Sequence, residues 1–490
     1  MKAISNSHSY AEWVRSHGFL LAGVIAFLFF FFSFYPPFFV AIDEHEYLKN
    51  AFLLREGSLI APDHSLYCGG NILSENRSIS SYPIGKSISL IPFTFLPFSW
   101  VFLSGLLLHL FNFLLIYIIL RRDTLPGEYS LLYLFLPLAA WESRTLFPEL
   151  GVLTLFLSGY WLWKKDRFHS TFGAGLLLGL SVFFRVDAVI GPLAFLVQAV
   201  VKERSKVIPF IAGGLIPALL FFGFNAAYYG GFLSTGYGST IEQVGSAINP
   251  AFLKNVVTYM ALLFVALPFS LWAIFRSKKE WPLFAVLSGG TILLFSHFTN
   301  FWDFSFSLPL TFTARLRYFL PLLGLLLIPT MTFYHLFFMR PTVRKFTERV
   351  SPAVIGGVFL LLAAGGLWAL NSSHYQLAAP RGEISAILPS FIPESSIVIG
   401  SADDCIYFLD PLFGERHYYP ISNYSNQEVP AGAYLLDIGY TSQQGKGGPR
   451  SELVDAEREL IRKYFRDHSD SLTQVFEGEN GFHLIISTKD

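Results

Sequence analysis

Apolar stretches separated by short polar loops cover about the first 370 residues of the chain. A helix needs about 20 apolar residues to cross the hydrocarbon core of a bilayer. The stretches that approach or exceed this length are residues 18–40, 99–120, 129–142, 149–163, 171–184, 188–201, 207–228, 256–275, 281–298, 318–338 and 352–370. The two neighbouring stretches within residues 129–163, and the two within residues 171–201, can be divided into spans in other ways. The pattern predicts an α-helical polytopic membrane protein with about 11 transmembrane helices.

Basic residues alternate between the loops in a way that orients these spans. If the N-terminus is cytoplasmic, each loop on the cytoplasmic side is short and contains Lys or Arg, as the positive-inside rule requires. These loops are residues 121–122, 164–167, 202–206, 276–279 and 340–349. An odd number of spans then places the C-terminus outside the cytoplasm.

The first outer loop, residues 41–98, is the longest between spans. Residues 44–56 have an amphipathic helical pattern, typical of a helix in the membrane interface. Asp43 precedes it and Glu46 follows three residues later, which predicts a capping box, and Gly57 ends it. The apolar, proline-containing segment 83–97 predicts a second interfacial helix.

The composition changes after about residue 370. Residues 371–490 have no apolar run long enough to cross a membrane, and they contain 17 of the chain's 35 acidic residues. Strands are predicted at 397–400, 433–438 and 483–487, and an amphipathic helix at 452–465. We therefore expect a transmembrane domain, residues 1–370, and a small extracytoplasmic α/β domain, residues 371–490.

Composition excludes several classes of protein. The chain is 53% hydrophobic and 14% charged, against about 25% charged in soluble domains. Its net charge of zero argues against a nucleic-acid partner. The first apolar stretch has no small-residue cleavage site before Asp43, which favours a retained span over a signal peptide. The two cysteines, Cys68 and Cys405, fall on the predicted outer side, where they could pair or remain separate thiols.

Polar motifs recur on the predicted outer face. Ionisable residues near lipid usually mark functional sites, so their recurrence on one face predicts a shared cavity. The motifs are Asp43-Glu44, Tyr82-Pro83-Ile84-Gly85-Lys86, Phe147-Pro148-Glu149, Arg185-Val186-Asp187, Asn225 through Tyr229, Gly236-Tyr237-Gly238 and Arg315-Leu316-Arg317-Tyr318.

The order and side of these motifs resemble the GT-C superfamily of integral-membrane glycosyltransferases. The similarity is greatest to the branch that includes protein O-mannosyltransferases and lipid A aminoarabinose transferases. The resemblance rests on four features. They are an acidic pair in a long first outer loop, a later Tyr-Pro element, a Pro-Glu at the next outer turn, and an Arg-Tyr-apolar-Pro sequence at the start of a late span. The resemblance departs at Ile84, which replaces one proline, and at Arg185-Val186, which matches an Arg-Pro element only in part. It covers about residues 18–340.

The resemblance implies transfer of a sugar from a polyprenyl-phosphate donor to an acceptor hydroxyl at the outer membrane face. No glycine-rich phosphate loop or Rossmann pattern for a nucleotide sugar is present. A carboxylate must accept the hydroxyl proton, and cations must stabilise the leaving phosphate. Asp43 is the expected base, with Glu44 next. The remaining candidates are Lys86, Arg315, Arg317 and Arg185 for the phosphate, and Tyr82, Glu149 and Tyr237 elsewhere in the site.

Each candidate also has a structural interpretation. Asp43 could cap the helix that follows it, Glu149 could stabilise a helix N-terminus, and Lys86 could extend to lipid headgroups. Arg185 could pair with Asp187. A divalent metal is a further possibility, with His45, Glu46 and His64 as candidate ligands, although their spacing matches no fixed motif.

Two other functions compete with glycosyl transfer. One is a polytopic transporter or flippase of cell-envelope glycan precursors, and the other is a non-enzymatic polysaccharide-assembly protein. Transporters usually carry charged residues at mid-bilayer in related halves, whereas this chain collects its charges in loops at one face. The resemblance places the protein in a bacterial inner or plasma membrane. Glycan, lipid and protein acceptors all remain open.

Overall fold

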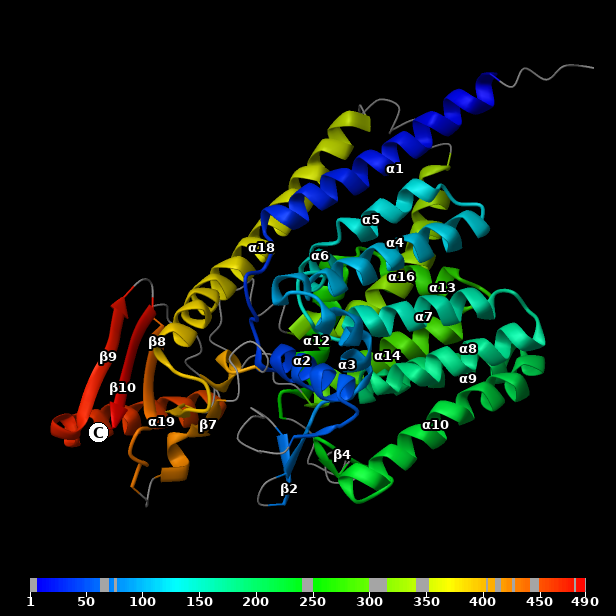
Figure 1. Ribbon diagram of the computed structural model, residues 1–490. Coiled ribbons are helices and arrows are strands. Elements are labelled where there is room, and N and C mark those ends of the chain that lie inside the picture. Colours follow the sequence, from blue (N-terminus) through cyan, green and yellow to red (C-terminus); the bar gives the residue numbers. More distant parts are fainter. Residues whose placement is uncertain are drawn as a thin grey trace, which may run out of the picture.

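The computed structural model describes residues 7–61, 70–74, 77–239, 250–298, 315–340, 352–401, 404–409, 416–424, 428–440, 449–479 and 482–489. A large helical bundle occupies most of the molecule, and a small domain built on a β-sheet lies beside it (Figure 1). The longer helices of the bundle are α1 (Ser7–Ser33), α4 (Leu103–Arg122), α7 (Glu149–Trp163), α8 (Phe168–Leu180), α9 (Ile190–Lys202), α10 (Val207–Tyr229), α12 (Phe252–Ala266), α13 (Ser270–Arg276), α14 (Trp281–Phe298), α16 (Leu320–Phe338) and α18 (Pro352–Phe391).

Short helices complete the bundle and the first outer loop. They are α2 (Ile42–Arg55), α3 (Gly85–Leu90), α5 (Leu131–Leu134), α6 (Pro137–Glu142) and the 3-10 helices η2 (Ile91–Phe95), η3 (Phe98–Trp100), η4 (Gly127–Ser130), η5 (Ser181–Phe183), η6 (Val186–Val189), η7 (Arg204–Lys206) and η8 (Arg317–Phe319). Every predicted apolar stretch is thus largely helical, but 129–142 is broken into η4, α5 and α6.

The lengths of these helices bear on the number of membrane crossings. In the described part of the chain, three helical segments are long and apolar enough to cross a bilayer alone: Phe98–Arg122, Arg204–Tyr229 and Arg317–Phe338. Helices α12 and α13 together are also long and apolar enough, but the chain bends by 85° between them. Others, such as α8 and α14, are apolar but shorter. The count of about 11 spans therefore stays a prediction.

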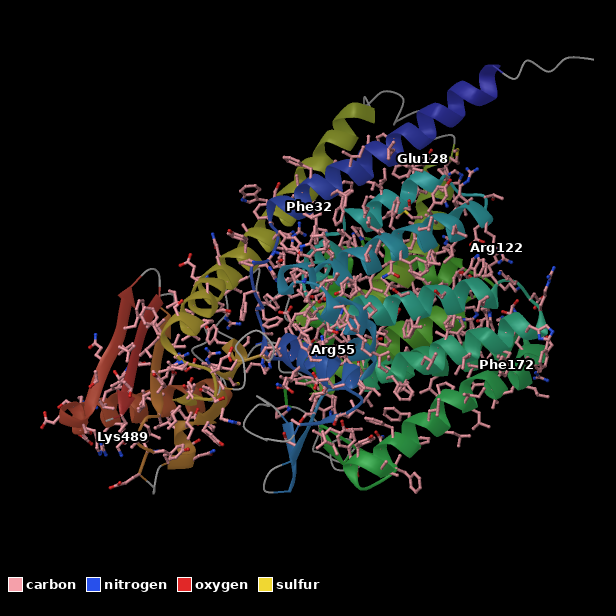
Figure 2. All side chains as sticks on the ribbon, viewed as in Figure 1. Phe32, Arg55, Arg122, Glu128, Phe172 and Lys489 are labelled. Atoms are coloured by element: carbon pink, nitrogen blue, oxygen red, sulfur yellow. The ribbon has the colours of Figure 1, made fainter. Side chains whose placement is uncertain are left out.

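Close helix packing at two glycines sets the arrangement of α8 against α10. A Cβ on Gly175 would lie 2.1 Å from the carbonyl oxygen of Phe210, and one on Gly213 would lie 2.0 Å from that of Phe172. Both contacts are shorter than any real Cβ contact, so only glycine permits this approach of the two backbones. Side chains fill the space between the helices (Figure 2).

The predicted cytoplasmic loops gather at one end of the bundle. Lys164, after α7, pairs with Asp123 after α4 at 3.3 Å and with Glu280 before α14 at 3.2 Å. Gln198 of α9 donates to the carbonyl of Lys279. Figure 2 shows Arg122, at the end of α4, well away from Arg55 of α2. The basic loops and the first outer loop therefore lie apart, as the charge pattern predicts.

Helix α2 begins at Ile42, two residues earlier than predicted, and ends at Arg55. Its N-cap is Ala41, so Asp43 lies inside the first turn and is not the capping residue. The backbone N–H of Ala41 donates to Glu44, which replaces the predicted Glu46 as the reciprocal partner. Residues 44–52 are all buried. The helix is therefore enclosed by protein, in contrast to the predicted exposed interfacial position.

A small antiparallel sheet follows α2 in the first outer loop. Its order is β1 (Ile60–Ala61), β3 (Arg77–Ser80) and β2 (Gly70–Ser74). A two-stranded ribbon, β4 (Ser234–Thr235) with β5 (Gly238–Ser239), follows α10. A Cβ on Gly236, at the tip of this ribbon, would lie 2.1 Å from the carbonyl oxygen of Ser81. Glycine therefore lets the ribbon contact the strand end that precedes Tyr82.

The C-terminal domain is a five-stranded mixed sheet with one long helix. The strand order is β7 (His417–Pro420), β6 (Ile397–Gly400), β8 (Tyr434–Tyr440), β10 (Phe482–Lys489) and β9 (Leu472–Glu479). Helix α19 (Pro449–Asp467) contacts β8. The shorter 3-10 elements are η9 (Asp404–Tyr407), η10 (Ile421–Tyr424) and η11 (Ser469–Ser471). The predicted strands and helix match β6, β8, β10 and α19, whereas β7 and β9 were not predicted.

One hydrophobic core joins the C-terminal domain to the first outer loop. It contains Phe39 and Leu48 around α2, Ile384 of α18, and Leu436 and Ile486 of the sheet. Helix α18 runs beside α1 and continues into the C-terminal domain (Figure 1), so the predicted boundary at residue 371 falls within it. The described cysteine, Cys405, is disulfide-bonded, and Cys68 lies outside the described residues.

Candidate active site

The side chain of Asp43 lies between two partners that come from distant parts of the chain. Its Oδ1 accepts a hydrogen bond of 2.9 Å from the Tyr82 hydroxyl. Its Oδ2 accepts one of 3.2 Å from Nη2 of Arg317. The side chain of Asp43 is 28% exposed. A partly exposed carboxylate with an ordered donor at each oxygen is suited to contact a substrate while its own position is held.

Arg317 is fixed by aromatic rings as well as by Asp43. Its guanidinium carbon lies 3.8 Å from the ring centroid of Phe147 and 4.8 Å from that of Tyr318. Nη2 also donates to the hydroxyl of Tyr318 at 3.0 Å. Stacking of this kind suits the planar guanidinium and leaves its edge available for hydrogen bonds.

Arg185 and Glu149 join the same group of charges. Nη1 of Arg185 donates to Glu149 at 2.8 Å, and Nε donates to Asp187 at 3.0 Å. Its guanidinium carbon lies 4.5 Å from the Tyr318 ring centroid, and Nε of Arg317 is 3.9 Å from Glu149. The buried Glu149 is thus shared by two arginines that enter from different helices. The expected pairing of Arg185 with Asp187 is present, within a larger cluster.

A guanidinium group has five N–H donors. The hydrogen bonds of these two arginines to described residues use Nη1 and Nε of Arg185 and Nη2 of Arg317. Donor capacity therefore remains on both side chains for a further anion. Two guanidiniums close together form the kind of site that binds phosphate oxygens with bidentate geometry.

Glu44 points away from Asp43 and is completely buried. Oε1 accepts hydrogen bonds from the backbone N–H of Val40 and Ala41, and Oε2 accepts one from that of Leu146. Burial raises the pKa of Glu44 to about 7, while these backbone donors act in the opposite direction. The geometry suits a role in holding the start of α2 against the chain that leads to α7.

Lys86 lies in α3 and is also completely buried. Its Nζ makes no hydrogen bond to any described residue. Burial lowers its pKa to about 8, and the carboxylates of Glu142, Glu44 and Glu149 act in the opposite direction. An unpaired buried ammonium is costly, so a bound anion or water in contact with Nζ would stabilise it. The surface position implied by an extension toward lipid headgroups is contradicted by this burial.

Tyr237 approaches the site from the β4–β5 ribbon. Its ring meets that of Tyr82 edge-on, with centroids 5.9 Å apart. Tyr82 in turn contacts the ring of Tyr47 in α2. The predicted residues Asp43, Tyr82, Glu149, Arg185 and Arg317 therefore form one connected cluster, and Tyr237 borders it.

The remaining candidates are Arg315 and the possible metal ligands His45, Glu46 and His64. Arg315 opens the described segment 315–340, and its role in phosphate binding stays a prediction. Nδ1 of His45 lies 3.7 Å from Glu46, and Nε2 lies 3.4 Å from the carbonyl oxygen of Phe408. His64 lies outside the described residues. Within the described ranges, no three His, Cys, Asp or Glu side chains are close enough to hold a metal ion.

Two residues of the cluster were not given a role in the site by the sequence analysis. Phe147 stacks on Arg317, and the fully buried Glu142, at the end of α6, lies within electrostatic range of Lys86 and Arg317. Glu142 falls at the end of a stretch interpreted as a membrane span. The polar run Glu142-Ser143-Arg144-Thr145 next to Pro148-Glu149 was the available signal.

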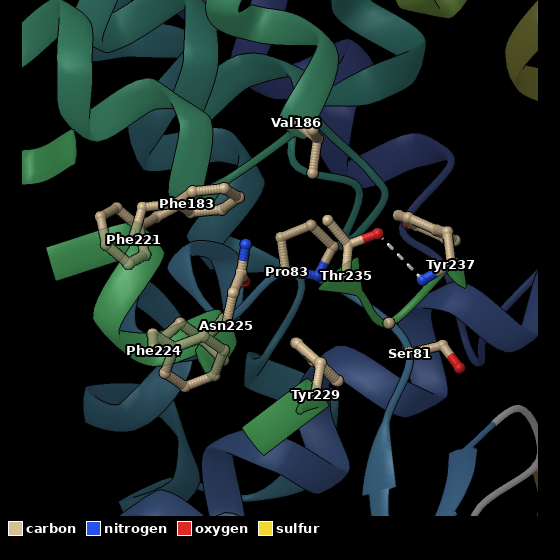
Figure 3. A pocket seen from close by; sticks show the side chains of 12 residues that line it. Ser81, Pro83, Phe183, Val186, Phe221, Phe224, Asn225, Tyr229, Thr235 and Tyr237 are labelled. Carbon is tan, nitrogen blue, oxygen red and sulfur yellow. Dashed lines mark hydrogen bonds between the residues drawn. The ribbon is translucent and has the colours of Figure 1, made fainter. Parts of the chain in front are cut away.

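Two pockets flank the segment Arg185–Asp187. The first is lined by Ser81, Pro83, Ile84, Phe183, Val186, Phe221, Phe224, Asn225, Tyr229, Thr235, Gly236 and Tyr237 (Figure 3). The second is lined by Val152, Phe156, Arg185, Asp187, Ala188, Ile190, Leu287, Thr291, Phe295, Tyr318, Pro321 and Leu322. We call them the neutral pocket and the arginine pocket.

Comparisons with known proteins bear on the fold. No family model matches the chain, and no curated protein matches its sequence. The solved structures similar to this chain include two crystal structures of ArnT from Cupriavidus metallidurans, in the apo state and bound to undecaprenyl phosphate. Their TM-scores are 0.57 and 0.52, each at 10% identity over 96% of this chain and 98% of that chain. The GT-C-like fold expected from the motifs is therefore confirmed.

Proposed function

We propose that the protein is a membrane glycosyltransferase that moves a sugar from a polyprenyl-phosphate donor to an acceptor hydroxyl. The observation that carries the proposal is the contact of Asp43 with Arg317, beside Arg185. A partly exposed carboxylate and two guanidiniums supply the two requirements of the reaction, a proton acceptor and a cationic site for the leaving phosphate.

The lipid nature of the donor is supported by two observations. The arginine pocket joins polar groups, the charged Arg185 and Asp187 and the hydroxyl of Tyr318, to an apolar wall from α7, α14 and α16, and the guanidinium beside apolar side chains would suit a phosphate attached to a hydrocarbon chain. A structure with the same fold is that of ArnT bound to undecaprenyl phosphate. Apolar helices of the bundle would give such a donor access from the bilayer.

The reaction is a single displacement at the anomeric carbon. The acceptor oxygen forms a bond to that carbon while the bond from carbon to the phosphate oxygen breaks. The hydroxyl proton passes to Asp43, and the bonding electron pair leaves with the polyprenyl phosphate. Arg317 and Arg185 stabilise the charge that grows on the phosphate, and this interaction is strongest in the transition state.

The neighbouring residues have positioning roles in this proposal. Tyr82 holds Oδ1 of Asp43, Glu149 fixes the spacing of the two arginines, and Glu44 anchors α2. Lys86 provides a second positive charge for the anionic donor. Tyr237 closes the side of the site next to Tyr82. Arg315 is a further candidate for contact with the phosphate.

The transferred group is a hexose or a pentose, and the reaction takes place at the outer face of a bacterial inner or plasma membrane. The N-terminus is then cytoplasmic and the C-terminal domain extracytoplasmic. The separation of the basic loops from the first outer loop (Figure 2) supports this arrangement. The rival transporter function would require an ionisable pathway across the bundle, whereas the described charges of the site converge at one end.

Asp43→Asn tests the proposal. The substitution keeps the size of the side chain and one acceptor oxygen but removes its capacity to take a proton. We expect a folded protein whose transfer from polyprenyl-phosphate sugars, followed as release of polyprenyl phosphate, falls by a factor of about 100 or more, the range for loss of a general base.

The matched control is Asp123→Asn, which removes a carboxylate that pairs with Lys164 among the predicted cytoplasmic loops. It should leave transfer within about twofold, as is usual for a surface ion pair. Turnover by Asp43→Asn at the wild-type rate would show that this carboxylate is structural. A wild-type protein that moves the lipid-linked sugar across the membrane without transferring it would favour the transporter.

A further inference from the structure

The two oxygens of Asp43 face different surroundings. Oδ1 is held by Tyr82, whose ring meets that of Tyr237. Oδ2 is held by Arg317, which donates also to Tyr318. Tyr237 lines the neutral pocket, and Tyr318 lines the arginine pocket. The donors to the two oxygens therefore lead, through Tyr237 and Tyr318, to different pockets.

The linings of the two pockets differ in chemistry. The arginine pocket contains the guanidinium of Arg185, together with Asp187. The described residues that line the neutral pocket include no Lys, Arg, Asp or Glu, and most are aromatic or aliphatic. An anion in the neutral pocket would lose its hydration without contacting a cationic side chain among these lining residues, which is unfavourable. An uncharged molecule would pay no such penalty.

The geometry of the displacement assigns a substrate to each side. In a single displacement the base and the leaving group lie on opposite faces of the sugar ring. The leaving phosphate belongs with the arginines, on the Oδ2 side of Asp43. The attacking hydroxyl then belongs on the Oδ1 side, next to Tyr82 and Tyr237, which is the side of the neutral pocket.

Asn225 provides the polar group that a hydroxyl-bearing ligand needs there. It is buried, and its Nδ2 donates to the carbonyl oxygen of Phe232 at 3.3 Å. This bond fixes the amide, whose carbonyl oxygen can accept a further hydrogen bond. Figure 3 shows Asn225 among the aromatic side chains Phe183, Phe221 and Phe224. Phe221 and Phe224 belong to α10, whose Leu219 and Leu220 are exposed on the apolar surface of the bundle.

We propose that the neutral pocket binds the acceptor, and that the acceptor is an uncharged, hydroxyl-bearing lipid. The proposal rests on the proposed glycosyl transfer. Helix α10 is one of the described segments able to cross the bilayer, so the lipid chain can enter between its aromatic side chains from the hydrocarbon region. The hydroxyl meets Asn225 and Tyr237, and its proton then faces Oδ1 of Asp43.

Photolabelling of the full-length protein in lipid nanodiscs tests this assignment. The probes are a diazirine-bearing dodecyl glucoside, which is neutral, and dodecyl phosphate with the same chain and diazirine. Val186→Trp fills the neutral pocket, and Thr291→Trp fills the arginine pocket. Undecaprenyl phosphate binding is measured on the same samples, and thermal melting confirms that each variant is folded. Phe224→Ala, which removes one aromatic wall, replaces Val186→Trp if the latter fails to fold.

We expect the glucoside probe to label peptides that contain residues 221–237. Val186→Trp should lower this labelling at least fivefold and leave undecaprenyl phosphate binding within twofold, and Thr291→Trp should do the reverse. Equal labelling of the same peptides by dodecyl phosphate would overturn the preference for a neutral ligand. Displacement of the glucoside label by undecaprenyl phosphate would overturn the assignment, because the pocket would then hold the donor chain.

These outcomes are separate from the fate of the proposed function. A wild-type protein that neither binds undecaprenyl phosphate nor transfers sugar would refute the glycosyl transfer. A protein that transfers sugar, but whose neutral pocket excludes the glucoside probe, would refute only the acceptor site.

Discussion

Arg317→Ala should damage the reaction more than any other single change at the predicted phosphate side. Two unit charges 3.2 Å apart, the separation of Arg317 from Asp43, attract by about 5 kcal/mol at an effective dielectric of about 20. A leaving phosphate at a similar distance would feel a similar field. Because Arg317 is 12% exposed and Asp43 28% exposed, water screens part of it. We therefore expect a loss of about 2–3 kcal/mol, within the usual range for one partner of a desolvated charge pair.

That loss corresponds to a decrease in kcat/KM of roughly 30- to 150-fold. The assay is release of polyprenyl phosphate from a polyprenyl-phosphate sugar, with the protein in nanodiscs. Arg317→Lys should recover part of the rate, because a point charge remains while the planar fork that stacks on Phe147 is lost. Arg340→Ala, which removes an exposed cation beyond the other end of α16, is the matched control and should stay within about twofold. Equal losses at both positions, or an Arg317→Ala rate within threefold of wild type, would refute phosphate stabilisation by Arg317.

Two further predictions follow from buried ionisable groups in the first outer loop. Burial lowers the pKa of Lys86 to about 8. If the charge of Lys86 assists donor binding, kcat/KM should therefore fall as the pH rises through about 8. Lys86→Arg should move this decline to higher pH, and an unchanged pH profile in the variant would exclude Lys86 from the site. Burial raises the pKa of Glu44 to about 7 from 4.5, so the folded state binds more protons than the unfolded state between these values. The contribution of Glu44 to the free energy of unfolding should then be greatest below pH 4.5 and decrease as the pH rises to about 7. Glu44→Gln should therefore reduce the pH dependence of the melting temperature over this interval. An unaltered pH dependence would assign it to other groups.

The sequence predicted the convergence of the candidate side chains better than the details of the chain around them. Asp43, Tyr82, Glu149, Arg185 and Arg317 are separated by up to 274 positions, yet they meet in one cluster. Their common membrane side was sufficient to predict this, because charge near lipid is costly and collects where function requires it. The membrane side of each motif can be predicted from the apolar spans and the basic loops, which are visible in the composition and periodicity of the sequence.

Other features depend on tertiary packing and could not be derived from local patterns. The α2 pattern suggests a polar face in contact with water, but other parts of the protein enclose the helix, so Lys49 and Asn50 are buried. Phe147 is one aromatic residue among many in the sequence, and its role appears only when Arg317 stacks on it. Glu142 was hidden at the end of an apolar stretch. Strands β7 and β9 occupy the edges of the sheet, where strand patterns are weakest.

The core shared by α2 and the C-terminal sheet has a consequence for biosynthesis. Leu48 packs in the same cluster as Ile486, a partner that is translated more than 400 residues later. At the usual rate of about 5–20 residues per second, the ribosome needs roughly 20–90 s to cover that interval. During this time the segment that bears Asp43 lacks its final neighbours, so we expect the nascent protein to insert its helices first and to acquire activity only after its last strands have emerged and crossed the membrane. A prematurely terminated chain would then occupy the bilayer without consuming lipid-linked sugar.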